Sequence, residues 1–413
     1  MKKKLLMAGI FLAAGLVIGC GKGDSDHPVD SPIIPEVSAE PLGGESSSES
    51  VGSSGQVSET TEVLNGLKVI KERKVVDGKM QSYLTGEWKP EEIAKRRSMA
   101  VMIPNNFHAG YSNSSAVLHQ HGTSKASIIY EAPVEGRITR LMCFFEDVED
   151  LDYIGPVRSS RDYYCYEAMA YDAIYVNWGL ARPFVEELIN STRIDNVSQS
   201  LAGIYNGAPE AFGNVSKSGY AKEFTSCLKL DGFEKAVERL GYSREYTDRF
   251  EQAFTFADDG YKATYDEYPD ATSIWPGGKG KNSGGYGNYG ADNVHFEYNP
   301  EDGLYYRYQY GDKMIDEFNG EQLAVTNVVF KICHGELKVP DDKEHDYLGF
   351  GVHGTGDCIV FTNGKAIKGT WERKSDYAPN LFLDENGNEI IFNQGKTWIC
   401  NIWKEYSEFI EYN

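Results

Sequence analysis

The chain has 413 residues, of which 41% are hydrophobic, and it carries a formal net charge of -21. The length leaves room for two ordinary domains and the composition supplies each with a core, which excludes disorder throughout. The negative charge repels polyanions, so it argues against nucleic acid as a partner.

The N-terminus, MKKKLLMAGIFLAAGLVIGC, joins three lysines to an apolar run of about fourteen residues. This pattern is typical of an export leader, because the run is shorter than the roughly 20 residues that a transmembrane helix needs. The last four residues resemble a bacterial lipobox. That resemblance implies that residues 1–19 are removed as a signal peptide and that Cys20 carries the lipid, for example palmitate. We therefore expect a lipid-anchored protein on the extracytoplasmic face of the cell membrane.

Residues 20–62 are rich in Ser, Glu, Gly and Pro and have almost no aromatic content, so we expect a disordered acidic tether after the lipidated cysteine. The next part, residues 63–255, alternates predicted strands and helices, which is typical of a layered α/β domain. The predicted strands are 99–103, 127–132, 138–145 and 173–179, and the predicted helices are 161–171, 183–190 and 232–241.

Glycines and serines dominate the end of residues 256–291, which we interpret as a linker or a lid loop. Residues 292–413 contain short apolar runs such as VHFEY, LYYRYQY, DCIVF and NEIIF, separated by turns such as Asn363-Gly364 and Asn386-Gly387. The expected fold class is α+β, with a layered N-terminal α/β domain followed by a smaller β-rich domain.

The stretch IGPVRSSRDYY, which begins at residue 154, combines a Gly-Pro turn signal with serines and two arginines. Ser159 or Ser160 is a good N-cap for the helix that follows, and Asp162 lies in its first turn. Arg158 and Arg161 flank this cap. Since a helix N-terminus offers unpaired N–H groups and a positive dipole end, the motif predicts a compact site for a carboxylate or a phosphate.

A set of short motifs is spread along both halves of the chain. The motifs are Tyr130-Glu131, Glu135-Gly136, Ile138-Thr139-Arg140, IGPVRSSRDY, Gly364-Lys365, Gly369-Thr370-Trp371, Asp384, Gly387 and GKTWI from Gly395. In order and spacing they resemble those of YerB-like bacterial lipoproteins. The resemblance spans about residues 99–403 and implies two domains, a membrane anchor and a location outside the cytoplasm. It implies no established activity and names no catalytic residue. One departure is the segment NFHAGYSNSSAVLHQHG, and another is the polar stretch around residues 216–224.

Glu131 and Glu135 have three interpretations. They form a structural ion-pair network with nearby arginines, they line a ligand-binding cleft, or they act as general acid and base. The leading hypothesis is a lipoprotein that binds an anionic small molecule or an envelope component and is not an enzyme. A cell-wall hydrolase that uses Glu131 and Glu135, or a scaffold for another envelope protein, is the alternative. The expected ligand-binding residues are Glu131, Glu135, Arg140, Arg158, Ser159, Ser160, Arg161 and Asp162.

No metal site or cofactor is expected. His119 and His121 have strand spacing but no third ligand nearby, and the acidic run that starts at Asp384 lacks the pattern of a calcium loop, so a hairpin turn explains it better. The phosphate-binding and nucleophile-elbow motifs are missing from the sequence. The cysteines other than Cys20 include no CxxC pair, which favours buried free thiols over a zinc site or a disulfide framework.

Overall fold

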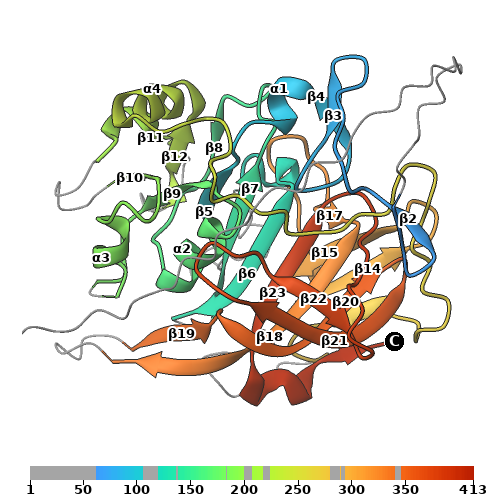
Figure 1. Cartoon of the computed structure of the whole chain (residues 1–413). Coiled ribbons are helices and arrows are strands. Elements are labelled where there is room, and N and C mark those ends of the chain that lie inside the picture. The colour runs from blue at the N-terminus through green and yellow to red at the C-terminus, as the bar shows by residue number, and fades with distance from the viewer. Residues whose placement is uncertain are drawn as a thin grey trace, which may run out of the picture. The chain divides into compact units, whose positions relative to one another are not determined.

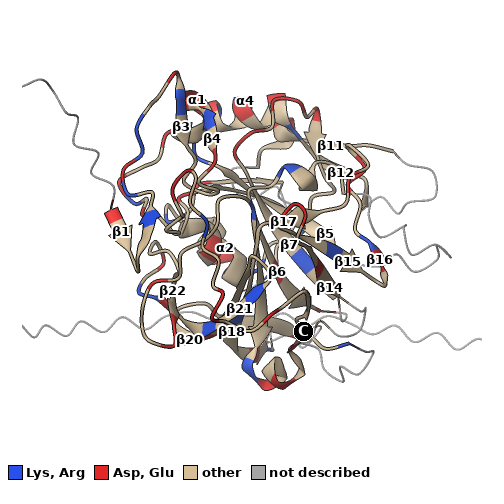
Figure 2. Ribbon diagram, turned by 90° about the vertical axis from the view of Figure 1, so that its right-hand side faces the viewer, with Lys and Arg blue, Asp and Glu red and all other residues tan. Residues whose placement is uncertain are grey.

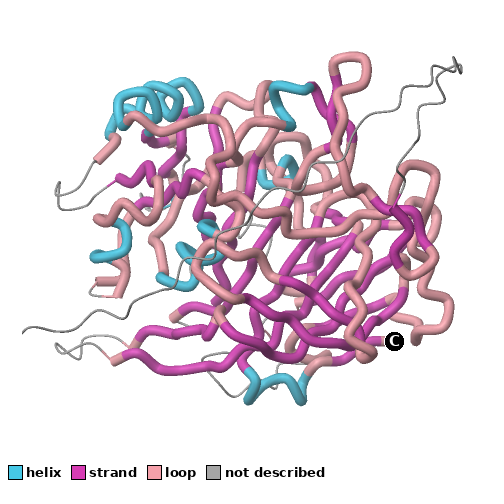
Figure 3. Tube along the Cα trace, in the orientation of Figure 1, coloured by secondary structure: helices cyan, strands magenta, loops and turns pink. Residues whose placement is uncertain are grey.

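The structure is a computed structural model that describes residues 62–105, 120–135, 138–182, 184–199, 207–216, 224–279, 289, 294–339 and 346–413. Strands dominate this part of the chain (Figure 3). The predicted signal peptide, Cys20 and the tether up to residue 61 lie outside the described residues. No helix within the described ranges is long and apolar enough to cross a membrane.

An 11-stranded mixed sheet forms the centre of the fold, and strand β19 pairs with β18 off its main path. The order along that path is β10, β9, β5, β7, β6, β23, β18, β20, β21 and β22. The N-terminal members are β5 (Met99–Asn105), β6 (Ile128–Val134), β7 (Ile138–Phe145), β9 (Ile174–Trp178) and β10 (Asn196–Gln199). The C-terminal members are β18 (Asn327–Lys338), β19 (Tyr347–Gly351), β20 (Gly354–Thr362), β21 (Lys365–Arg373), β22 (Leu381–Asp384) and β23 (Thr397–Trp403).

Strands β5 and β6 are buried along their whole length, as their apolar runs without alternation predict. Successive side chains of a strand point to opposite faces. Val101 and Ile103 accordingly join one hydrophobic cluster, whereas Ala100 and Met102 join another. The central sheet is therefore covered on both faces by apolar side chains.

Four α-helices lie among the described residues: α1 (Glu91–Ala94), α2 (Asp162–Met169), α3 (Glu186–Ile189) and α4 (Leu230–Leu240). The predicted helices at 161–171 and 232–241 are confirmed, and the one at 183–190 is shorter than expected. Helix α4 ends at Gly241, whose φ is +74°. There the Tyr242 N–H donates to the Val237 carbonyl and the Gly241 N–H to the Glu238 carbonyl, both at 3.1 Å, which is a Schellman motif. Short 3₁₀ helices span Thr123–Lys125, Pro209–Ala211 and Lys404–Phe409.

The predicted serine N-cap of α2 is wrong. Arg161 occupies the N-cap position in an extended conformation, and no side chain caps the helix. The Ser160 hydroxyl instead accepts a hydrogen bond from the Tyr175 hydroxyl at 2.8 Å and contacts the Cys165 thiol. Ser160 is fully buried, so its hydroxyl serves as a hydrogen-bond partner for the buried Tyr175 side chain and does not cap the helix.

A six-stranded sheet packs beside the central one, since its residues Phe296 and Tyr305 belong to the same hydrophobic cluster as Val101. It contains β13 (Ser273–Trp275), β14 (His295–Asn299), β15 (Leu304–Gln309), β16 (Asp312–Lys313), β17 (Ala324–Val325) and β24 (Glu411–Tyr412). Smaller sheets are formed by β8 (Tyr153–Ile154), β11 (Phe212–Asn214) and β12 (Ser226–Lys229), by β1 (Glu62–Leu64) with β2 (Leu67–Val69), and by β3 (Lys79–Gln81) with β4 (Trp88–Pro90).

Most predicted C-terminal strands are confirmed. Asn363 and Gly364, with φ of +50° and +71°, form the tight turn between β20 and β21, as the Asn-Gly pair predicts. The run NEIIF is not a strand. Glu389 and Phe392 there make only isolated bridges, to Leu383 and Phe256 respectively.

The fold is mixed α+β, as expected, but a separate layered N-terminal α/β domain is not shown. Strand β6 of the first half pairs in parallel with β23 of the second, from Ile128 opposite Thr397 to Glu131 opposite Cys400 (Figure 1). Within the predicted linker, Phe256, Ala271 and Ile274 are buried. The predicted domain boundaries, 63–255, 256–291 and 292–413, stay predictions. The pairing of β6 with β23 joins strands from both halves of the chain in one sheet.

Candidate functional site

The motif from Arg158 to Arg161 lies beside the central sheet, immediately before α2. Its backbone is fixed there, because the Arg158 N–H donates to the Met102 carbonyl of β5 at 2.9 Å and the Trp178 N–H of β9 donates to the Arg158 carbonyl at 3.0 Å. Ser160 also bridges to Leu180. The start of α2 therefore lies beside strands β5 and β9.

Arg161 and Glu135 form the principal ion pair of the site. The Arg161 Nε donates to both carboxylate oxygens of Glu135 at 3.2 Å, and its Nη2 also contacts Glu135. The Leu348 N–H donates to Glu135 Oε1 at 3.2 Å. Burial alone would raise the pKa of Glu135, but the hydrogen bonds and the charge of Arg161 outweigh it and lower this pKa. Glu135 is therefore a carboxylate at neutral pH.

Arg140 is the most confined arginine of the site, with 6% of its surface exposed. Its Nη1 donates to the Ser159 carbonyl at 2.9 Å, whereas its Nε has no hydrogen-bond acceptor among the described residues. Burial and the charges of Arg161 and Arg158 lower the pKa of Arg140 to about 9. Arg140, Arg158 and Arg161 therefore lie close together, and we call them the arginine cluster. Within it, the positive charges of Arg161 and Arg140 act on the Glu135 carboxylate.

Aromatic rings flank this cluster. The Arg161 guanidinium lies 5.4 Å from the centre of the Tyr347 ring, and that of Arg158 lies 5.6 Å from the Phe224 ring. Rings of this kind hold a guanidinium group in place without neutralising its charge. The arrangement keeps the cluster positive while restricting where its donors point.

Glu131 is not part of this cluster. It lies in the core with no exposed surface, and its Oε1 accepts from Arg307, Asn105 and Thr139 at 2.8, 3.1 and 2.7 Å. Its Oε2 accepts from Trp398 at 2.9 Å. The two glutamates thus have separate partners, and the described contacts do not bring them into one acid–base pair. Of the three interpretations, the structural ion pair fits Glu131 best.

Ser159 and Asp162, two further predicted ligand-binding residues, make contacts within the protein. The Ser159 hydroxyl donates to the Trp178 carbonyl at 3.4 Å, and the Asp162 carboxylate pairs with Lys338. Burial would lower the pKa of Lys338, but its bond to Asp162 outweighs that and raises it. This ion pair fastens the start of α2 to β18.

Strands β18 and β19 contribute residues to the site that the sequence does not indicate. Lys338, Tyr347 and Leu348 reach the site from a part of the chain 176 or more residues away from their partners. Equally without a signal in the sequence is a buried cluster in which Glu167 pairs with Lys331 at 2.7 Å and Arg373 at 3.3 Å. No local pattern indicates such pairs, because neither partner lies near the other in sequence.

The histidines and cysteines among the described residues form no further site. His121 stacks on Tyr153 at 3.9 Å, His119 lies outside the described residues, and the described ranges contain no metal-binding group of three or more His, Cys, Asp or Glu side chains. The six cysteines from Cys143 to Cys400 are free and buried, as expected. Burial raises the pKa of each, for instance that of Cys165 to about 12, so these thiols stay protonated.

Comparisons with known proteins agree on one family. The N-terminal domain of a protein of unknown function (DUF3048) matches residues 84–243, and its C-terminal domain matches residues 286–399. A relative from Bacillus subtilis (strain 168), named "Putative lipoprotein YerB", is 25% identical over 326 residues, which cover 78% of this chain and 86% of the relative.

The fold agrees as well. The crystal structure of the YerB protein from Bacillus subtilis superimposes with a TM-score of 0.60 and 22% identity, over 81% of this chain and 99% of that one. At this identity the likeness establishes the fold alone. Together with the two domain matches, these findings establish that the chain belongs to the YerB-like family.

Proposed function

We propose that this protein is a lipoprotein, anchored through Cys20 on the extracytoplasmic face of the cell membrane, which binds an anionic small molecule or an anionic group of the cell envelope. The anchor is supported by the leader pattern and by the name of the Bacillus subtilis relative. Binding is supported by the arginine cluster, and it involves no chemical step.

The observation that carries the proposal is Arg140. A buried N–H donor without an acceptor costs free energy, and the cost is larger when the donor is charged. Arg140 Nε is such a donor among the described residues, and two further guanidinium groups lie close enough to lower the pKa of Arg140. An incoming anion supplies an acceptor and a neutralising charge at once.

Carboxylate and phosphate are the anions that fit best, because the planar guanidinium fork matches two of their oxygens. The first turn of α2 adds N–H groups that no side chain caps. Glu135 already engages Arg161, so a ligand would bind chiefly through Arg140, whose Nε has no acceptor among the described residues. The net charge of -21 disfavours long polyanions, and acidic residues are spread over many elements (Figure 2).

Thermal melting with and without anions tests the binding site. Sodium phosphate and sodium acetate should raise the melting temperature of the parent protein above that in sodium chloride of equal ionic strength. Arg158→Ala and Arg140→Met should abolish this increase. The control is Arg239→Ala, whose side chain is 49% exposed and pairs with Glu210, and it should respond like the parent. Equal responses from the parent and both cluster variants would refute anion binding here.

Membrane fractionation tests the anchor. Cys20→Ala should prevent lipidation, so the protein should either keep its leader or leave the membrane fraction. Ser25→Ala, a neighbouring change in the predicted tether, should have no effect. If the Cys20 variant lost its leader and still fractionated with the membrane like the parent, the anchor would have to be assigned elsewhere.

A further inference from the structure

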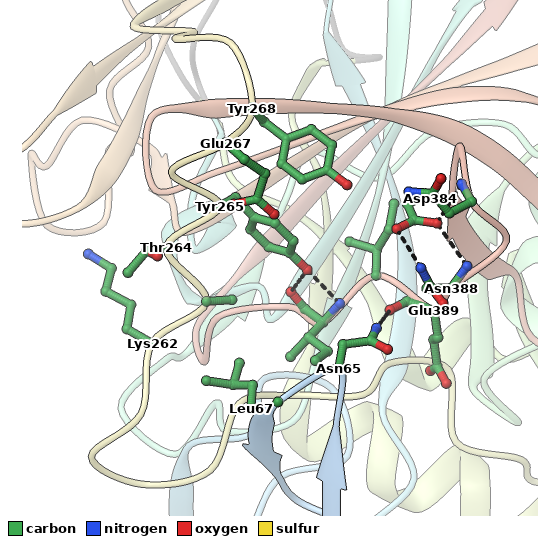
Figure 4. Close-up of a pocket in the computed structure, with 15 residues that line it drawn as sticks. Asn65, Leu67, Lys262, Thr264, Tyr265, Glu267, Tyr268, Asp384, Asn388 and Glu389 are labelled. Atoms are coloured by element: carbon green, nitrogen blue, oxygen red, sulfur yellow. Dashed lines mark hydrogen bonds between the residues drawn. The ribbon is translucent and has the colours of Figure 1, made fainter.

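A pocket lies between the turn of the β1–β2 hairpin, residues 262–268 and the segment that follows β22 (Figure 4). The pocket has a volume of about 420 Å³. No residue of the arginine cluster lines it. The side chains that matter for its chemistry are Lys262, Tyr265, Glu267, Tyr268, Asp384 and Glu389.

Two tyrosines give the pocket its aromatic wall. The Tyr265 hydroxyl donates to the Ile391 carbonyl at 3.0 Å and accepts from the Ile391 N–H at 2.9 Å, which fixes its ring. The Tyr268 ring packs edge-on against it, with centroids 5.5 Å apart and an interplanar angle of 78°. In Figure 4 the Tyr268 hydroxyl points across the pocket toward Asp384.

Carboxylates supply the charge. Asp384 accepts from the backbone N–H groups of Asn386 and Asn388 at 2.9 and 2.8 Å and from the Asn388 side chain at 3.1 Å. Burial would raise the pKa of Asp384, but these hydrogen bonds lower it, so the group is ionised at neutral pH. Glu267 adds a second acidic side chain, and Glu389 adds a third, whose Oε1 accepts a hydrogen bond from the Thr255 hydroxyl at 2.6 Å. Lys262 is the basic residue of the lining. The lining therefore carries an excess of negative charge.

We propose that this pocket binds the ammonium group of a small organic cation. A positive group placed in it meets carboxylates and tyrosine rings together, and both attract cations. The volume is within the usual range for a small-molecule site. Anions are repelled by the same lining, so this ligand class differs from that proposed for the arginine cluster, and the two proposals stand or fall separately.

A matched pair of probes tests the charge requirement. Cyclohexylammonium and cyclohexanol have the same ring and differ in the charged group. Saturation-transfer NMR titrations of the full-length protein should give binding of the ammonium compound, with cyclohexanol at least about tenfold weaker. Raising sodium chloride from low to physiological concentration should weaken the ammonium compound and leave cyclohexanol unchanged. Equal affinity for both probes would overturn the proposal.

Variants then assign the binding to this pocket. Glu267 is exposed, so Glu267→Gln should leave the fold intact while weakening cyclohexylammonium about fivefold, the effect of one charge in water. Tyr268→Leu should weaken it by a similar factor through loss of the ring. The control Glu301→Gln removes an exposed carboxylate outside the pocket and should change nothing. Unchanged affinity in both pocket variants would contradict this assignment.

Discussion

Removal of the Arg307 side chain should destabilise the protein strongly. Its guanidinium has no exposed surface, donates to Glu131 at 2.8 Å, and lies 4.8 Å from the rings of both Phe296 and Trp398. Arg307→Met keeps most of the volume but leaves the Glu131 carboxylate buried with neutral donors only. Breaking a buried ion pair in this way costs about 3–5 kcal/mol.

The lower end of that range is the better estimate. Arg307 Nε and Nη1 have no hydrogen-bond acceptor among the described residues, so the substitution also removes two unsatisfied donors. Glu131 in addition keeps hydrogen bonds from Asn105, Thr139 and Trp398. We therefore expect a loss of about 3 kcal/mol in the free energy of unfolding.

Urea unfolding measures this loss, as a lower midpoint with an unchanged slope. The exposed ion-pair variant Arg239→Gln should lose at most about 1 kcal/mol. The double variant Glu131→Gln, Arg307→Met should be more stable than the sum of the single losses predicts, because no unpaired charge remains buried. If Arg307→Met lost less than about 1 kcal/mol, Glu131 would not depend on this partner and the structural interpretation of the pair would fail.

Three further outcomes are expected. Gly232→Ala should destabilise α4 by about 1–3 kcal/mol in thermal melting, although alanine favours helices, because the new Cβ would lie 2.1 Å from the Glu210 carbonyl oxygen; Glu238→Ala on the exposed face of that helix should change stability by less than about 0.5 kcal/mol. The pKa of Glu135 is lowered from its ordinary 4.5, so the ionised carboxylate stabilises the folded protein above that pH. The difference in the free energy of unfolding between the parent and Glu135→Gln should therefore be largest above about pH 4.5 and should shrink as the pH falls below that value. A constant difference down to pH 2 would contradict this. The six described cysteines should react with a thiol reagent at pH 8 only after unfolding, because each is buried with a raised pKa.

The parts of the fold that follow from local pattern could be predicted from the sequence. Gly241 ends α4 because glycine adopts the left-handed conformation with little strain. The turn at Asn363-Gly364 also requires positive φ angles, which these two residue types tolerate. The apolar runs of β5 and β7 predict buried strands with nearly correct ends. The predicted N-cap of α2 is wrong because the Ser160 hydroxyl accepts a hydrogen bond from Tyr175 in the core. The sequence does not indicate that Tyr175 and the helix terminus compete for this hydroxyl.

Pairings between distant residues could not be predicted. Arg307 and Glu131 are 176 residues apart, and nothing near either residue specifies the other. For the candidate site, the sequence indicated Arg140, Arg158, Arg161 and Glu135 because they are close in the chain. Glu131 was expected at the same site, because the sequence of β6 does not show that the Glu131 side chain lies on the face that contacts Arg307.

The parallel pairing of β6 with β23 has a consequence for how the chain reaches its native state. The paired strands begin at Ile128 and Thr397, so the sheet is completed only by nearly the last strand to be synthesised. Until β23 arrives, β6 and β18 each present an open edge of unpaired N–H and C=O groups. Contacts this distant in sequence slow folding and lengthen the exposure of such edges. Truncation before residue 397 should therefore yield aggregating protein rather than a smaller folded one.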